Sequence, residues 1–185
     1  MLPSAEPTTC RPRVLACVLE HPGAHLREVA RRCGLPLGTT LYHLDRLESR
    51  GEVAVRRDGR YKRYYGATAM GRHEKDVLSA LRHDAPRRLV LALLAHGAGG
   101  LTQRELAGML SLSRSTVSFH ASQLAQAQLL RRLDTRPEGR YEVAEPDAVR
   151  ALLTRYRSSL ETPQDAALFE RVLASGAVPR EEAVA

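Results

Sequence analysis

Residues 102–124 read TQRELAGMLSLSRSTVSFHASQL. Thr102 is followed three residues later by Glu105, which is the spacing of a capping box, so a helix is expected to begin there. Apolar residues then recur at helical spacing as far as Leu110, and the hydroxyl of Ser113 can cap a second helix just beyond. The stretch therefore predicts two helices joined by a short turn.

The same pattern occurs earlier in the chain, where residues 25–47 read HLREVARRCGLPLGTTLYHLDRL. A shift of 77 positions aligns identical residues of the two stretches: Arg27, Glu28, Ala30, Leu35, Thr39, His43 and Leu47 fall on Arg104, Glu105, Ala107, Leu112, Thr116, His120 and Leu124. The Gly-Arg-Tyr triplets at 59–61 and 139–141 match at an offset of 80, which predicts three additional residues at a hairpin tip in the second copy. The chain is therefore interpreted as a duplicated module.

Each copy is predicted to contain three helices followed by a β-hairpin. The helices are expected at 11–20, 26–33 and 37–49 in the first copy, and at 84–96, 103–110 and 114–127 in the second, with Asp84 as an N-cap. The apolar period then changes toward two, which predicts strands at 52–55 and 129–133 and turns at Asp58-Gly59 and 137–139. This order of elements is the plan of the winged helix-turn-helix fold.

The predicted fold class is mostly α with small β-hairpin wings (α+β), consisting of two tandem winged helix-turn-helix domains plus C-terminal helices. The expected boundaries are a first domain at 9–66, a linker helix at 67–83, a second domain at 84–146, C-terminal helices at 147–175 and a flexible tail at 176–185. Amphipathic helices are expected at 74–82, 148–160 and 166–174.

Composition narrows the class of partner. Lys and Arg total 28 against 21 Asp and Glu, and the resulting net charge of +7 favours an anionic partner such as nucleic acid. No stretch has the roughly 18 apolar residues of a membrane span, and the first residues do not resemble a secretion signal, so a soluble cytoplasmic protein is expected. The three cysteines form no CxxC pair, which favours reduced thiols in or near a core over a metal or redox site.

Both third-helix segments resemble those of known regulators. The segment LSRSTVSFH at 112–120, followed by Leu124, resembles the recognition-helix segment of bacterial and archaeal ArsR-like winged-helix repressors. The segment LPLGTTLYHLDRL at 35–47 resembles the same part of archaeal winged-helix regulators, some of which carry two such domains. The resemblance covers 11–66 and 84–146. It implies a third helix in the major groove, a wing on the backbone or minor groove, and often a homodimer. The metal-binding cluster of ArsR-type sensors has no match, so no metal is expected.

Helical spacing sorts the third helix of the second copy into two faces. Val117, Ala121 and Leu124 form one stripe that is expected to face the core. The residues expected to face outward and contact DNA are Arg114, Ser115, Ser118, Phe119 and Ser122, joined by Arg136 and Arg140 of the second wing. An ordinary solvated helix face is the alternative.

The first copy differs from the second. Its outward positions are Leu37, Gly38, Leu41, Tyr42 and Asp45, which form a poorer reading surface, and its candidate helix contacts are Thr39, Tyr42 and Arg46. Residues 56–63 nevertheless carry a net charge of +4, and the wing contacts expected there are Arg56, Arg57, Arg60, Lys62 and Arg63. A solvated charge run is the alternative. We hypothesise that the first copy holds DNA mainly through its wing and that the second reads it through its helix.

Other motifs point away from catalysis and cofactors. His43 and His120 occupy equivalent positions and are interpreted as packed or phosphate-contacting histidines, with a pH or metal switch as the alternative. The glycines at 97–100 lack the Lys-Ser/Thr of a phosphate-binding loop and are interpreted as a helix stop. With no catalytic constellation in a supporting context, the chain is not expected to be an enzyme or to need a cofactor.

The predicted function is a DNA-binding transcriptional regulator associated with the nucleoid, with double-stranded DNA as its partner. One alternative is a tandem winged-helix structural adaptor of the chromosome-segregation type that binds protein. Another is a chromatin-associated protein that binds DNA without sequence preference. The apolar stripe at 149–156 could form a homodimer interface, as could the linker helix, or it could pack against its own domain. The sequence does not identify an effector.

Overall fold

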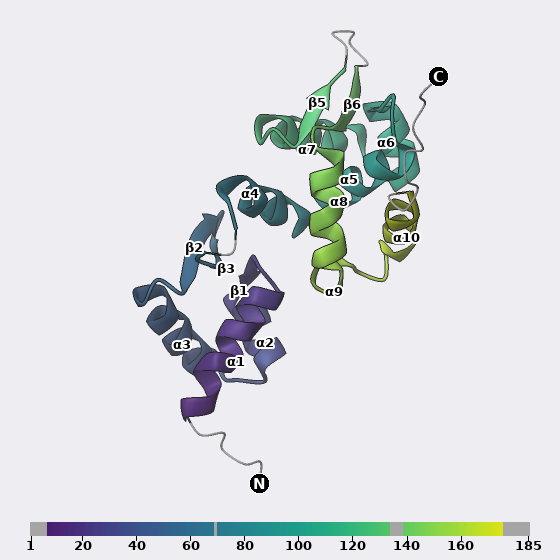
Figure 1. The fold of residues 1–185 in the computed structure, drawn as a ribbon. Helices are drawn as coiled ribbons and strands as arrows, with labels where there is room; N and C mark the ends of the chain where they lie inside the picture. Colours follow the sequence, from purple (N-terminus) through teal and green to yellow (C-terminus); the bar gives the residue numbers. More distant parts are fainter. Residues whose placement is uncertain (1–6, 69, 134–138, 176–185) are drawn as a thin grey trace, which may run out of the picture. The chain divides into compact units, whose positions relative to one another are not determined.

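The computed structural model describes residues 7–68, 70–133 and 139–175 (Figure 1). The chain divides into two compact units, residues 1–79 and 80–185. Each unit has the same order of elements in its winged-helix part. Within the described ranges, no helix is long and apolar enough to cross a bilayer.

The first unit begins with three helices and a short strand. They are α1 (Pro7–Glu20), β1 (Ala24–His25), α2 (Leu26–Cys33) and α3 (Leu37–Ser49). The hairpin β2 (Val53–Asp58) and β3 (Tyr61–Gly66) follows, and then α4 (Arg72–Leu81). β1 pairs antiparallel with β3, so the sheet order is β1-β3-β2. The strand β1, which is only two residues long and adds a third strand to the predicted hairpin, was not predicted.

The second unit repeats this arrangement and adds three C-terminal helices. Its winged-helix part contains α5 (Asp84–His96), β4 (Leu101–Thr102), α6 (Gln103–Leu110), α7 (Arg114–Gln126), β5 (Leu130–Arg132) and β6 (Arg140–Val143). The sheet order is β4-β6-β5, equivalent to that of the first unit. The added helices are α8 (Pro146–Arg155), α9 (Arg157–Leu160) and α10 (Ala166–Ser175). The predicted fold class, mostly α with small β-hairpin wings in two tandem winged helix-turn-helix domains plus C-terminal helices, is confirmed.

Local capping explains why several helices begin where the sequence predicts. The hydroxyl of Thr102 accepts a hydrogen bond from the Glu105 backbone N–H, and the Glu105 carboxylate accepts one from the Thr102 N–H, which completes the capping box of α6. Ser113 caps α7 by accepting from the Thr116 N–H at 3.1 Å. The prediction for Asp84 is wrong, because Asp84 is the first residue of α5 rather than its N-cap.

The register of the two hairpins corrects the predicted insertion. Tyr64 pairs with Ala24 and Val55 in the first sheet, and Tyr141 pairs with Leu101 and Arg132 in the second. Each of these residues lies 77 positions from its counterpart, the offset that relates the preceding helices. The three additional residues predicted from the triplets at 59–61 and 139–141 are therefore absent. Residues 137 and 138 of the predicted second turn lie outside the described part of the chain.

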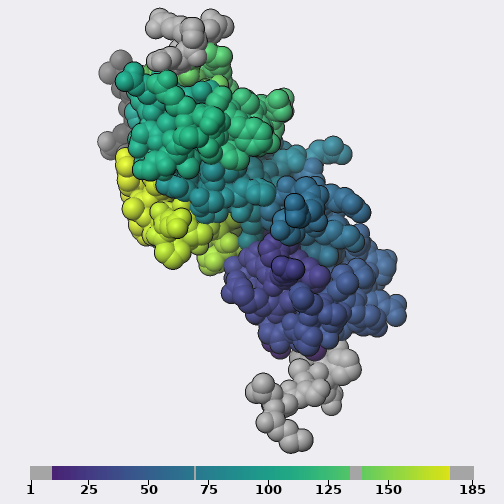
Figure 2. All heavy atoms as spheres, turned by 180° about the vertical axis from the view of Figure 1, so that it is seen from behind, coloured from purple at the N-terminus to yellow at the C-terminus, as the bar shows by residue number. Residues whose placement is uncertain are grey.

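The C-terminal helices of the second unit bury their apolar side chains within that unit. The stripe of α8 and the residue after it, consisting of Val149, Leu152, Leu153 and Tyr156, is buried. α10 packs on α5, and its place on the surface of this unit is visible in yellow in Figure 2. Of the two interpretations of this stripe, packing against its own domain is the one observed, and the stripe is not available as a homodimer interface.

A buried ion pair holds the segment just before α10 against α5. Asp165 is fully buried just before the helix, and its carboxylate lies 2.6 Å from the guanidinium of Arg87 on α5. Thr162 also donates to this carboxylate at 2.7 Å. Because a buried charge is costly unless it is paired and hydrogen-bonded, this contact specifies where the C-terminal helices join the second domain.

Candidate nucleic-acid interface

α7 presents a polar, acid-free face. Its core side is formed by Val117, Ala121 and Leu124, all of which are buried. The side chains predicted to contact DNA lie on the opposite side: Arg114, Ser115, Phe119 and Ser122 are exposed, and Ser118 is half-buried. No acidic residue occurs anywhere in α7. Such a face offers a cation and hydroxyl donors without the charge repulsion that an acidic residue would bring to phosphates.

An exposed aromatic ring stands at the centre of both third helices. Tyr42 on α3 is 57% exposed and Phe119 on α7 is 58% exposed. Each ring contacts the following histidine edge-on, at centroid distances of 5.3 Å for Tyr42–His43 and 5.1 Å for Phe119–His120. His43 is buried, and His120 is half-buried. The two histidines therefore act as packing partners that orient an outward-pointing ring.

The remaining face of α3 is more apolar than that of α7. Leu37 and Leu41 are exposed on it, as is Asp45, while Thr39 is half-buried. The guanidinium of Arg46 lies over the Tyr42 ring, 5.6 Å from its centroid. The exposed charges of α3 are one cation, Arg46, and two carboxylates, Asp45 and Glu48, so its electrostatic attraction for DNA is weak.

Two arginines of the first hairpin form ion pairs within the first unit instead of lying free on its surface. Arg63 is only 5% exposed; its guanidinium pairs with Asp58 and donates to the Gly23 carbonyl at 3.0 Å. Arg56 pairs with Asp76 of α4 at 2.6 Å. Burial of Arg63 removes it from the surface that could reach a phosphate, and the contact with α4 reduces the charge that Arg56 offers.

The other three predicted wing residues form the accessible cationic surface. Arg57, Arg60 and Lys62 are all exposed; Arg60 lies in the two-residue turn that joins Asp58 to Tyr61, and the other two lie on the strands on either side of it. Gly59 takes a positive φ of 57° in this turn, which a side chain would disfavour. We refer to these three residues as the wing cations.

The second hairpin repeats the internal brace. Arg140 occupies the position equivalent to Arg63, donates to the Gly100 carbonyl at 2.8 Å, and lies 3.3 Å from the Glu105 carboxylate. Arg136 lies outside the described residues. Arg131 and Arg132 on β5 are exposed and were not singled out from the sequence; the signal available was their position directly before the hairpin tip.

The cysteines form part of the core of the first unit. All three are free thiols and all are buried. Burial, together with the neighbouring Cys33, raises the pKa of Cys17 to about 12, so this thiol stays protonated near neutral pH and is a poor nucleophile or metal ligand. In the three described ranges, no group of three His, Cys, Asp or Glu side chains is placed to hold a metal ion.

Comparison with protein families agrees with this arrangement. Residues 8–78 match a family model described as an N-terminal HTH domain. Residues 83–131 match a second model, described as winged helix-turn-helix DNA-binding. No curated protein matches the chain. The first match lies within the first compact unit and the second match within the second, which confirms the prediction of two tandem domains of DNA-binding type.

Proposed function

Because the chain consists of two tandem winged helix-turn-helix domains of DNA-binding type, we propose that it is a transcriptional regulator that binds double-stranded DNA. In this proposal α3 and α7 enter the major groove and the hairpins contact the backbone. The observation that carries it is the exposed face of α7, where Arg114 and three serines surround Phe119 without any acidic side chain. The protein would act in the cytoplasm, on the nucleoid.

The two domains make different contributions. α7 has the residue types that read base edges: Arg114 can donate to guanine O6 and N7, and the Phe119 ring can contact a thymine methyl group. α3 lacks such a set, but its hairpin carries the wing cations, which suit the phosphate backbone. The chain would therefore hold DNA chiefly through the first wing and read it chiefly through the second helix, as an asymmetric clamp.

One observation favours the adaptor alternative for the first domain. Leu37 and Leu41 are exposed beside Tyr42 on α3, a composition more typical of a protein contact than of a groove. The wing cations on the same unit favour DNA instead, because protein recognition by the apolar face would not need them. We therefore retain DNA binding for both domains.

Selection from a pool of random-sequence duplexes tests this function. The full chain should retain DNA at about 0.2 M salt and enrich a common sequence over successive rounds. Phe119→Ala should reduce the enrichment, whereas the matched control Arg171→Ala, on an exposed residue of α10, should leave it unchanged. Retention without enrichment would replace the regulator by a non-specific DNA binder, and absence of retention at about 0.05 M salt would leave the protein-binding adaptor.

A further inference from the structure

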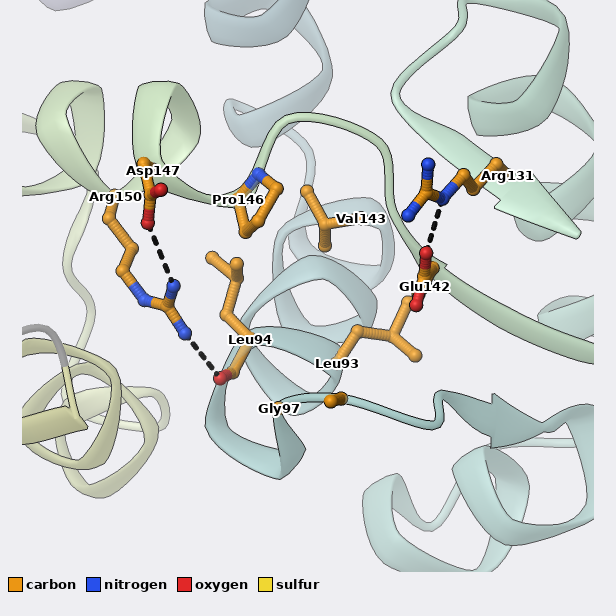
Figure 3. A pocket seen from close by; sticks show the side chains of 10 residues that line it. Leu93, Leu94, Gly97, Arg131, Glu142, Val143, Pro146, Asp147 and Arg150 are labelled. Carbon is orange, nitrogen blue, oxygen red and sulfur yellow. Dashed lines mark hydrogen bonds and ion pairs between the residues drawn. The ribbon is translucent and has the colours of Figure 1, made fainter. Parts of the chain in front are cut away.

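The second unit contains a pocket beside its hairpin (Figure 3). It has a volume of about 380 Å³ and is bounded by the C-terminal end of α5, the strands β5 and β6, and the start of α8. Small-molecule sites in proteins typically measure about 300–1,000 Å³. The pocket is therefore large enough for a small organic molecule.

One wall of the pocket is apolar. Leu93 and Leu94 contribute from α5, Val143 from the end of β6, and Pro146 from the first turn of α8. The two leucines and Val143 are almost completely buried, so they form a rigid surface. The exposed apolar surface of the pocket belongs to Pro146 and Ala98, and a ligand with a hydrocarbon or aromatic body would gain free energy by covering it.

The two arginines that line the pocket differ in how well an acidic partner neutralises them. Arg131 on β5 forms an ion pair with Glu142 on β6, and these two charges neutralise each other. Arg150 on α8 has a weaker partner: Asp147 lies 3.5 Å away, and its side chain is 93% exposed to solvent. An exposed ion pair of this kind contributes little, so the cation of Arg150 is the least compensated charge at the pocket.

The hydrogen bonds of Arg150 show the same imbalance. One terminal nitrogen, Nη2, donates to the Leu94 carbonyl at 3.1 Å, which holds the guanidinium against the end of α5. The Nε–H has no acceptor among the described residues, but it has no accessible surface either, so a ligand in the pocket would reach the terminal nitrogens instead. In the described part of the chain the other terminal nitrogen, Nη1, donates only to the exposed Asp147 at 3.5 Å, so it is the donor that a ligand acceptor could take over.

We propose that this pocket binds a small organic carboxylate with an apolar body. The carboxylate would accept hydrogen bonds from Arg150 in place of the exposed Asp147, and the apolar body would cover Pro146 and Ala98. A carboxylate suits the guanidinium because its two oxygens match the paired N–H donors, whereas a cation would be repelled by Arg150.

Occupancy of the pocket would affect DNA binding through the hairpin. Arg131, Glu142 and Val143 line the pocket from β5 and β6, the two strands of the second wing. A bound carboxylate would therefore contact the base of the hairpin directly. This regulatory step rests on the proposed function, whereas binding of the carboxylate itself does not. A ligand that favours one wing position should change DNA affinity by about 5- to 150-fold.

Calorimetry on the DNA-free full chain tests the site with phenylacetate as the probe. Phenylacetate should bind with a Kd of about 1 mM or tighter, and the neutral phenylacetamide and the cationic phenethylamine should bind at least about tenfold more weakly. Arg150→Gln should abolish binding, while the control Arg155→Gln, on an exposed residue of the same helix, should not. Because Arg150 also holds α8 to α5, a second variant, Ala98→Phe, fills the pocket without touching that contact.

The outcomes of these experiments distinguish the proposed carboxylate site from its proposed effect on DNA affinity. Absence of phenylacetate binding, equal binding of the amide or amine, or unchanged binding in Ala98→Phe or in a folded Arg150→Gln protein would overturn the proposed site. Binding that requires Arg150 but leaves affinity for a random-sequence duplex unchanged would overturn the regulatory step. Failure of the protein to bind any duplex, with phenylacetate binding intact, would overturn the proposed function and leave the carboxylate site standing.

Discussion

Replacement of the three wing cations by alanine should lower DNA affinity in a salt-dependent way. Arg57, Arg60 and Lys62 are exposed at the tip of the first hairpin, and each can neutralise one phosphate. Each phosphate contact contributes about 0.9 to the slope of log K against log salt, so the triple variant should lose about 2.7 units of slope. Referred to 1 M salt, the same relation gives an affinity loss of about 500-fold at 0.1 M salt and about 80-fold at 0.2 M salt.

Fluorescence anisotropy with a labelled random-sequence duplex, titrated at several salt concentrations, measures this slope. The full chain and the triple variant should converge as salt rises, because the lost free energy is that of counterion release. Arg155→Ala with Arg171→Ala is a matched control that removes two exposed cations outside both hairpins, and its slope should stay close to that of the parent. A slope change below about 1, or an equal loss of affinity at every salt concentration, would refute the assignment of these residues to phosphate contacts.

Three further predictions concern α7, the ion pair at α10 and the cap of α6. Phe119→Ala should lower the ratio of affinities for the selected sequence and a random duplex by about tenfold, measured by competition; an unchanged ratio would show that the ring reads no base. Asp165→Asn should lower the free energy of unfolding by about 3 kcal/mol in urea titrations, because Arg87 would lose its buried counter-charge, and a loss below about 1 kcal/mol would contradict this. Thr102→Ala should cost about 1 kcal/mol at pH 7. Hydrogen bonds from Thr102 lower the pKa of Glu105, so the stability they provide is present above the ordinary glutamate pKa of 4.5 and is lost as the pH falls through the lowered value. Thr102→Ala keeps the backbone N–H bond to this carboxylate and removes the hydroxyl bond, so the part of the stability difference that comes from the hydroxyl bond should be lost in acid; a constant difference would exclude this linkage.

The sequence alone determined the helices of the repeated module. The predicted ranges 26–33, 37–49, 84–96 and 103–110 coincide with α2, α3, α5 and α6. These helices are specified locally: the Thr102–Glu105 capping box starts α6, and Gly97 with its positive φ ends α5. Apolar spacing also assigned the core and outward faces of α7. Val117, Ala121 and Leu124 are spaced by four and three residues, which places them on one face of a helix, and all three are buried.

The charges of the two hairpins could be located from the sequence but not assigned a role. Arg63 and Lys62 are adjacent in a basic run, yet one is buried in a brace to Gly23 and the other is exposed. Alternation along a strand predicts that neighbours point to opposite faces, but the sequence does not show that Gly23, 40 residues away, offers a carbonyl to one of those faces. The same holds for Arg56, whose partner Asp76 lies on α4.

Only the tertiary structure decided the hairpin register and the use of the C-terminal helices. The Gly-Arg-Tyr triplets suggested an insertion, whereas the pairing of Tyr64 with Ala24 and of Tyr141 with Leu101 shows that the two copies keep one offset throughout. The stripe of α8 was equally suited to a partner chain and to its own domain, and the fold buries it within the second unit. Caps and periodicity act between residues within one turn of a helix, so they are readable in sequence, whereas register and burial depend on contacts between segments that only folding brings together.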